Sequence, residues 1–247
     1  MAEDAQNSPF IKNLASSDKR TRDQALDSLR AFLSSRSEIS ELDLLKLWKG
    51  LFYCLWMQDK PLHQQALSRS LASLPSSLKD AVVLPFLRAF WITISREWTQ
   101  IEALRLDKYL YLIRQYLNAS FRFLSQHSWA NTKAVDEHGK ILEEIPLNTG
   151  EGDGIRIPNG LRFHVLDVWV DELNKVDGTW GLEKRDVLER LCGPVERLAA
   201  EGKLKVLRTA AKECLGDERL RSWRGQEVQV EDMNTDDEEE EWGGIED

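Results

Sequence analysis

Ser40-Glu-Leu-Asp-Leu-Leu-Lys-Leu-Trp-Lys-Gly-Leu-Phe-Tyr-Cys-Leu-Trp56 carries apolar side chains on nearly every face of a helix. Ser40 is a suitable N-cap because its hydroxyl can accept a hydrogen bond from an amide of the first helical turn. A helix that is apolar all round is stable only where other elements cover each of its faces. The segment therefore predicts a buried helix packed between other helices.

The rest of the chain repeats this helical pattern with short breaks, and strand-like alternation is almost absent before residue 227. Pro61 suits the first turn of a helix. Pro85 removes a backbone donor, so residues 78–95 form either one helix or a pair broken at this proline. Thr99-Gln-Ile-Glu102 has the pattern of a capping box that opens a long helix to about residue 124. We expect further helices over residues 9–14, 21–33, 61–74, 78–95, 128–142, 161–176, 183–200 and 204–215.

Helix pairs of this kind recur at a spacing of roughly 40 residues, which is typical of HEAT-type repeats. No repeated sequence motif accompanies the spacing. The pattern predicts an all-α protein and favours a HEAT-like helical repeat, an α-solenoid, over a closed bundle. Residues 146–160 hold four glycines and two prolines and predict the single long loop.

The charge of the 247-residue chain is distributed unevenly. The formal net charge is -9, yet residues 227–247 contain 11 acidic residues and no lysine or arginine. Residues 1–226 therefore hold 33 basic and 31 acidic residues and are nearly neutral. We expect a helical repeat domain over residues 1–226 and a disordered acidic tail over residues 227–247.

Neither export nor membrane insertion is indicated. The first residues lack the basic and apolar regions of a signal peptide. The longest apolar stretch, residues 81–94, is interrupted by Pro85 and Arg88 and is shorter than the roughly 20 residues that cross a bilayer. Three scattered cysteines form no CxxC pair and predict reduced, mostly buried thiols.

Catalytic and metal-binding patterns are weak throughout. The glycine-rich segment 150–154 lacks the lysine of a phosphate-binding loop and carries two carboxylates, so we interpret it as a loop. The four histidines show no metal-ligand spacing. Cys54 and His63 could pair as nucleophile and base, but Cys54 lies in the most apolar helix, where a thiolate is disfavoured. We expect no enzyme, no cofactor and no metal site.

Two features indicate binding. Arg105, Lys108 and Arg122 fall within about one quadrant of a predicted helix and could contact an RNA backbone, although a solvated helix face is the better explanation of the pattern. Trp242 follows the acidic run of residues 236–241, so the tail either docks on a basic partner or is simply solvated. Most other aromatic residues are expected in the core.

Residues 47–61, Leu-Trp-Lys-Gly-Leu-Phe-Tyr-Cys-Leu-Trp-Met-Gln-Asp-Lys-Pro, resemble the eukaryotic nucleolar family of ribosomal RNA-processing protein 1. The resemblance continues at residues 95–98, 104–109 and 157–161, and it covers roughly residues 8–176. Members of the family often extend into long basic C-terminal regions, whereas residues 227–247 of this sequence are acidic.

The resemblance implies a non-enzymatic, α-helical assembly factor of nucleolar pre-60S particles, required for processing of precursor rRNA. Its implied partners are other assembly factors and ribosomal proteins, with local contact to precursor rRNA left open. Junctions between helices of a solenoid commonly meet partners. Together with the basic quadrant and the tail, this gives the candidate interface residues Lys49, Asp59, Lys60, Arg96, Trp98, Arg105, Lys108, Arg122 and Trp242.

One rival function belongs to a different class. An adaptor or chaperone could use the acidic tail to shield a basic ribosomal or assembly protein during nuclear import. The scaffold hypothesis predicts location in the nucleus and nucleolus within a large particle, whereas the adaptor hypothesis predicts a light complex with one free basic protein.

Overall fold

The computed structural model describes residues 9–14, 16, 18–150 and 156–226. Within these residues it contains α-helices and short 3-10 turns and no strand. The α-helices are α2 (Pro9–Leu14), α3 (Lys19–Ser35), α4 (Glu41–Trp56), α5 (Pro61–Ala72), α6 (Asp80–Glu97), α7 (Leu106–Leu124), α8 (Thr132–Glu144), α9 (Asn159–Val176), α10 (Arg185–Glu201), α11 (Lys205–Leu215) and α12 (Glu218–Trp223).

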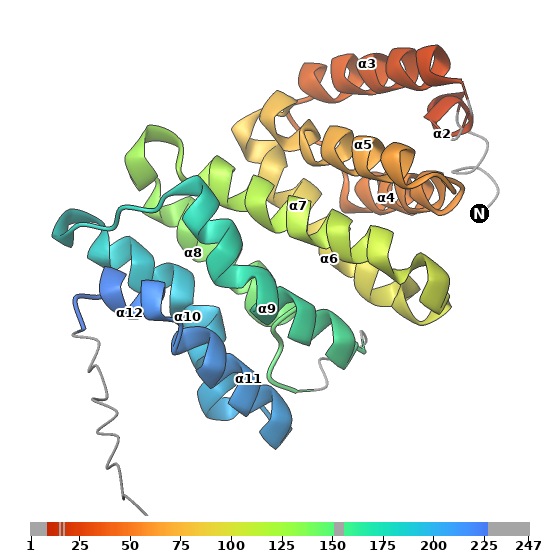
Figure 1. Cartoon of the computed structure of the whole chain (residues 1–247). Coiled ribbons are helices and arrows are strands. Elements are labelled where there is room, and N and C mark those ends of the chain that lie inside the picture. The colour runs from red at the N-terminus through yellow and green to blue at the C-terminus, as the bar shows by residue number, and fades with distance from the viewer. Residues whose placement is uncertain (1–8, 15, 17, 151–155, 227–247) are drawn as a thin grey trace, which may run out of the picture.

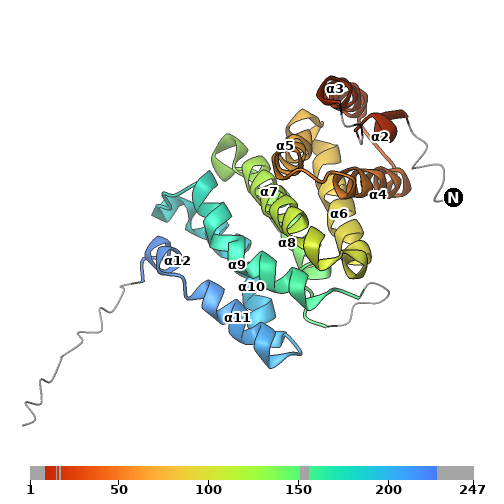
Figure 2. The same cartoon turned by 45° about the vertical axis from the view of Figure 1, so that its right-hand side comes forward.

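The helices are stacked in two rows. Helices α4, α6, α8 and α10 pack against one another in sequence along one row, and α5, α7, α9 and α11 form the other. Figures 1 and 2 show the pairs following one another from α2 and α3 at one end to α11 and α12 at the other. This arrangement confirms the predicted all-α solenoid.

The repeat is less regular than the sequence pattern predicts. The first helices of the four pairs begin at residues 41, 80, 132 and 185, which gives spacings of 39, 52 and 53 residues. The later spacings are longer because 3-10 turns at Trp98–Gln100, Ala103–Arg105 and Gln126–Trp129 and the long loop lengthen the connections. The 40-residue period therefore holds for the first step and is wrong for the others.

Local capping explains several helix starts. The Ser40 side chain accepts a hydrogen bond from the amide of Asp43, as predicted for α4. Pro61 occupies the first turn of α5, where its missing N–H costs no intrahelical bond. Asn131 caps α8 through the amide of Ala134, so this helix begins at Thr132 and not at residue 128.

Of the two alternatives for residues 78–95, the structure shows the single helix. Helix α6 passes through Pro85 without a break, because Pro85 and Ala81, whose carbonyl loses its donor, both lie on the exposed side. Thr99 and Glu102 do not form a capping box; Glu102 instead accepts a hydrogen bond from Arg105, and α7 begins only at Leu106. Helix α12 was not predicted, since six residues carry little periodic signal.

A single hydrophobic core runs through the described residues from Leu14 to Leu220. Trp48 lies at its centre, with its ring centroid 4.9 to 5.1 Å from those of Phe86, Phe90 and Tyr116. Its indole Nε1 donates a hydrogen bond of 3.0 Å to the Phe86 carbonyl. The expected burial of α4 between other helices is confirmed. Over the residues that the structure describes, no helix is both long and apolar enough to cross a membrane.

Candidate interaction surface

Antiparallel helices place every second connection at the same edge of the solenoid. The α4–α5 turn, the α6–α7 link, the α8–α9 loop and the α10–α11 turn all lie at one edge, which we call the junction edge (Figure 1). Most of the candidate residues predicted from sequence belong to these connections or lie next to them. Exposed apolar side chains also occur there, including Met57, Leu62 and Leu104.

Lys49 lies in a polar network that joins α4 to the end of α6. Its ammonium is 3.3 Å from the carboxylate of Glu97, which is buried. The Tyr53 hydroxyl lies 3.5 Å from Glu97 Oε2 and 3.3 Å from Gln100 Oε1. Burial, followed by the charge of Glu97, raises the pKa of Tyr53, so this phenol remains protonated and can donate. Lys49 is half-exposed and remains available to a partner.

Arg105 is fixed at the start of α7 by three kinds of contact. Its guanidinium stacks over the Trp56 ring at 5.0 Å and donates a 2.7 Å hydrogen bond to the Trp56 carbonyl. It also lies 3.7 Å from the exposed carboxylate of Asp59. These contacts hold Arg105 against the α4–α5 turn, with Asp59 and the neighbouring Lys60 exposed beside it.

The structure corrects the prediction of an RNA-facing quadrant on α7. Lys108 is only 4% exposed, and its ammonium donates to the carbonyls of Trp56 and Gln58 at 2.8 and 2.9 Å. Burial lowers its pKa to about 8. Arg122 is exposed but lies 14 residues further along α7, about 21 Å along the helix axis. Lys108 is therefore a structural link between α7 and the α4–α5 turn.

Arg96 and Trp98 border a cleft at the junction edge that the sequence pattern did not reveal. The cleft has a volume of about 710 Å³ and lies between the end of α6, the start of α9 and the α10–α11 turn. Trp98 packs so closely on Gly160 of α9 that a Cβ atom there would lie 3.2 Å from the ring. The residues lining the cleft are Ser95, Arg96, Thr99, Thr149, Gly150, Arg156, Ile157, Pro158, Asn159, Arg162, Lys203, Leu204 and Leu207.

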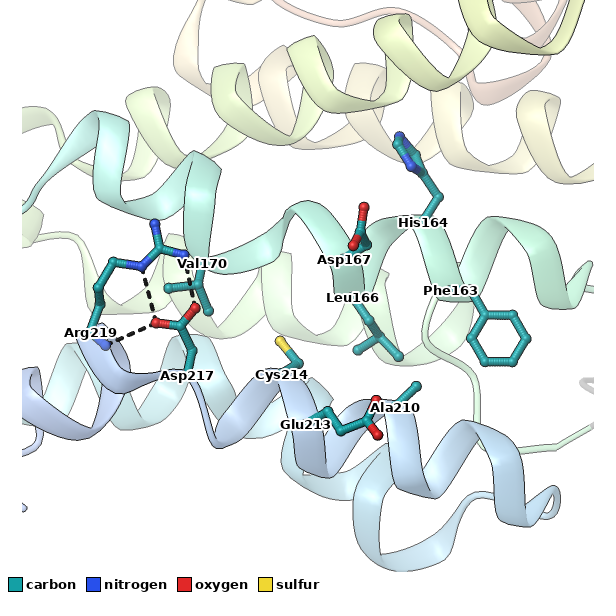
Figure 3. Close-up of a pocket in the computed structure, with 10 residues that line it drawn as sticks. All are labelled: Phe163, His164, Leu166, Asp167, Val170, Ala210, Glu213, Cys214, Asp217 and Arg219. Carbon is teal, nitrogen blue, oxygen red and sulfur yellow. Dashed lines mark hydrogen bonds and ion pairs between the residues drawn. The ribbon is translucent and has the colours of Figure 1, made fainter. Parts of the chain in front are cut away.

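A second pocket lies between α9 and α11 and has a volume of about 550 Å³ (Figure 3). Arg219 and Asp217 form an ion pair at one end, at 2.8 Å. In Figure 3 the ring of His164 is directed away from α11, and its Nε2 lies 2.9 Å from the Leu110 carbonyl of α7. Cys214 faces the pocket from α11, and burial raises the pKa of its thiol to about 12. No thiolate–imidazole pair is formed here.

The cysteine nucleophile and the metal site considered in the sequence analysis can also be compared with the structure. Burial raises the pKa of Cys54 to about 12, which disfavours the thiolate that a nucleophile would need. Within the described residues, no group of three or more His, Cys, Asp and Glu side chains is placed to hold a metal ion. Trp242 and residues 151–155 lie outside the described residues, as does the whole acidic tail.

The fold defines an α-helical repeat protein whose helix junctions lie along one edge and border a cleft. The chain belongs to the family described as nucleolar protein, Nop52, whose model matches residues 5–245. This confirms the family resemblance carried by the motifs of residues 47–61 and 95–109.

Named relatives agree with this membership. Ribosomal RNA processing protein 1 homolog B of Homo sapiens is 36% identical over 200 residues, covering 78% of this chain and 26% of the relative. The Mus musculus homolog B is 38% identical over 202 residues, 78% of this chain and 27% of the relative. Homolog A of Homo sapiens is 37% identical over 173 residues, covering 68% of this chain and 36% of the relative. The match thus spans about a quarter to a third of these relatives' length.

Proposed function

We propose that this chain is a non-enzymatic scaffold of nucleolar pre-60S particles, where it supports precursor rRNA processing and large-subunit assembly. The observation that carries the proposal is the junction edge, because several of the family's motif residues belong to its connections. Asp59 and Lys60 lie in the α4–α5 turn, and Arg96, Trp98 and Arg105 lie at the end of α6 or in the α6–α7 link. A rigid row of turns with mixed charge and exposed apolar side chains suits binding to several partners at once.

The family and its relatives support the same role. The family is described as nucleolar, and the relatives are named for ribosomal RNA processing. The partners would be other assembly factors and ribosomal proteins, with local contact to precursor rRNA. The location would be the nucleus and the nucleolus.

The direct test uses a tagged chain in cells whose lysate is separated on a density gradient. Co-migration with large-subunit precursors and their precursor rRNA is the expected result. A test variant that combines Arg105→Glu and Lys60→Glu reverses two charges on the junction edge. It should move the protein to light fractions while circular dichroism shows an unchanged helical signal. Absence of the unmodified protein from all precursor fractions would contradict the scaffold proposal.

The acidic tail favours the adaptor as a second candidate. Eleven acidic residues without a single lysine or arginine over residues 227–247 could neutralise a basic client during import. This function predicts a stable complex with one free ribosomal or assembly protein in light fractions. It also predicts that the isolated chain fails to accumulate in the nucleus when that client is depleted.

A further inference from the structure

The cleft at the junction edge contains positive charge without matching carboxylates. Among the described residues that line it, Arg96, Arg156, Arg162 and Lys203 are basic and none is acidic. Arg96, Arg156 and Lys203 are exposed and form no ion pair with any other described residue. Charges of one sign that converge on a concave surface concentrate ligands of the opposite sign.

Arg162 supplies a fixed charge at the floor of this cleft. Its side chain belongs to a residue that is only 7% exposed, and it makes all its hydrogen bonds to neutral oxygens. Nη1 donates to the Ile157 carbonyl at 2.7 Å and to Asn159 Oδ1 at 3.0 Å. Nε and Nη2 donate to the carbonyls of Asn148 and Gly150. A guanidinium stays charged in proteins, so this buried cation lacks a counter-ion within the part of the chain that is described.

Ser95 adds an unused hydroxyl to the same cleft. The residue is 3% exposed, it lines the cleft, and its Oγ has no hydrogen-bond partner among the described residues. A buried hydroxyl without a partner costs free energy, and a bound acceptor would recover that cost. The hydroxyl is therefore an independent indication that a polar ligand completes this site.

The start of α9 contributes free amides to this site. Pro158 precedes the helix and provides no side-chain cap. The first intrahelical bonds come from the amides of Leu161 and Arg162 to the Pro158 carbonyl, which leaves the amides of Asn159 and Gly160 without an intrahelical acceptor. Such amides together with the helix dipole favour an anion.

We propose that this cleft binds the phosphodiester backbone of RNA, with Arg96 and Lys203 on the phosphate oxygens and Ser95 and the start of α9 completing the contact. Arg and Lys side chains, hydroxyls and helix N-termini are the groups that contact nucleic-acid phosphates in proteins. The choice of RNA rests on the proposed function, since a phosphorylated peptide would present the same oxygens.

Fluorescence anisotropy of the full chain with a fluorescein-labelled, single-stranded 12-nucleotide RNA tests this site. Arg96→Gln with Lys203→Gln should weaken binding at least tenfold. Because each neutralised phosphate contributes about 0.7 to the slope for a single strand, this variant should also lower the slope of log affinity against log salt by about 1.4. The matched control, Lys79→Gln with Lys133→Gln, removes two exposed lysines from the opposite edge and should bind as the unmodified chain does.

Ser95→Ala provides a second variant that is independent of charge. Since its hydroxyl has no partner to lose, the melting temperature should stay within about 2 °C. RNA binding should weaken about threefold. Equal RNA binding by the cleft variants and the control would overturn the proposal, as would stronger competition by a phosphoserine peptide than by unlabelled RNA.

The segment next to the cleft needs its own control. Residues 151–155 carry Glu151 and Asp153 and lie outside the described residues. Glu151→Gln with Asp153→Asn should change RNA affinity by less than about threefold. A gain of more than tenfold would mean that these carboxylates are the natural counter-ions of the cleft, and it would overturn the proposal.

The density gradient separates this inference from the proposed function. If the unmodified chain sediments with precursors but the cleft variant binds RNA normally, the cleft assignment fails and the scaffold stands. If the cleft variant loses RNA binding but the unmodified chain never enters precursor particles, the cleft assignment stands and the scaffold fails.

Discussion

Acidification from pH 7 to pH 5 is expected to weaken the fold through a single buried histidine. His138 of α8 is fully buried, its ring packs edge-on against Phe121 at 6.3 Å, and its Nε2 has no hydrogen-bond partner among the described residues. Burial lowers its pKa from 6.5 to about 4. The neutral ring is therefore the form that the folded state retains.

The sign of the effect follows from proton uptake. Between pH 6.5 and about pH 4 the unfolded chain binds a proton at His138 that the folded chain does not, so stability falls as pH falls. Each pH unit in this window costs about 1.4 kcal/mol, which gives a loss of about 2 kcal/mol at pH 5. His164 adds in the same direction, since burial lowers its pKa too. The carboxylates with lowered pKa values, such as Asp171, act only near pH 4 and below.

Guanidinium denaturation at pH 7, 6 and 5, followed by tryptophan fluorescence, measures this loss. His138→Leu removes the titrating ring and the unpaired nitrogen while keeping an apolar side chain of similar size. The variant should lose about 2 kcal/mol less than the unmodified protein between pH 7 and pH 5. Identical losses in both proteins, or a folded-state pKa of His138 near 6.5 by NMR titration, would refute the reasoning.

Three further changes test the fold. Trp48→Ala should lower the free energy of unfolding by about 4 kcal/mol in guanidinium denaturation, because it empties the aromatic centre of the core; a loss below 1 kcal/mol would contradict that central position. Ser128→Gly should raise stability by about 1 kcal/mol, since Ser128 has a φ of 56°; an unchanged denaturation midpoint would show that the turn is not strained. Deletion of residues 227–247 changes the formal net charge from -9 to +2 and should leave a cooperative thermal transition, measured by calorimetry, within about 2 °C of the full chain.

Much of the fold could be predicted from sequence because its signals are local. The Ser40 cap, the first-turn Pro61 and the apolar faces of α4 need only neighbouring residues to be recognised. Pro85 left the continuity of α6 undecided, since a proline within a helix is tolerated only where the affected turn is exposed. The Thr99–Glu102 pattern failed because Arg105 competes for the Glu102 carboxylate.

The binding surface was predicted only in part, because it depends on contacts between distant residues. Helix junctions could be expected at an edge, and Asp59, Arg96 and Trp98 do lie in or next to the α4–α5 turn and the α6–α7 link. The burial of Lys108 depends on carbonyls about 50 residues earlier, which no local pattern encodes. The cleft was missed for the same reason, since it forms only where residues 95–99, 149–150, 156–162 and 203–207 meet.

The left-handed turn between α7 and α8 has a consequence for folding during synthesis. His127, Ser128 and Trp129 all have positive φ, a conformation that is unfavourable for residues with side chains. The Trp129 indole is held by a 2.9 Å hydrogen bond to Asp177, 48 residues downstream, and by the Trp180 ring. A nascent chain that ends before Asp177 and Trp180 lacks the contacts that stabilise the turn. We therefore expect the α7–α8 connection to become fixed only after α9 and the residues that follow it have been synthesised, so that a later part of the repeat stabilises an earlier one.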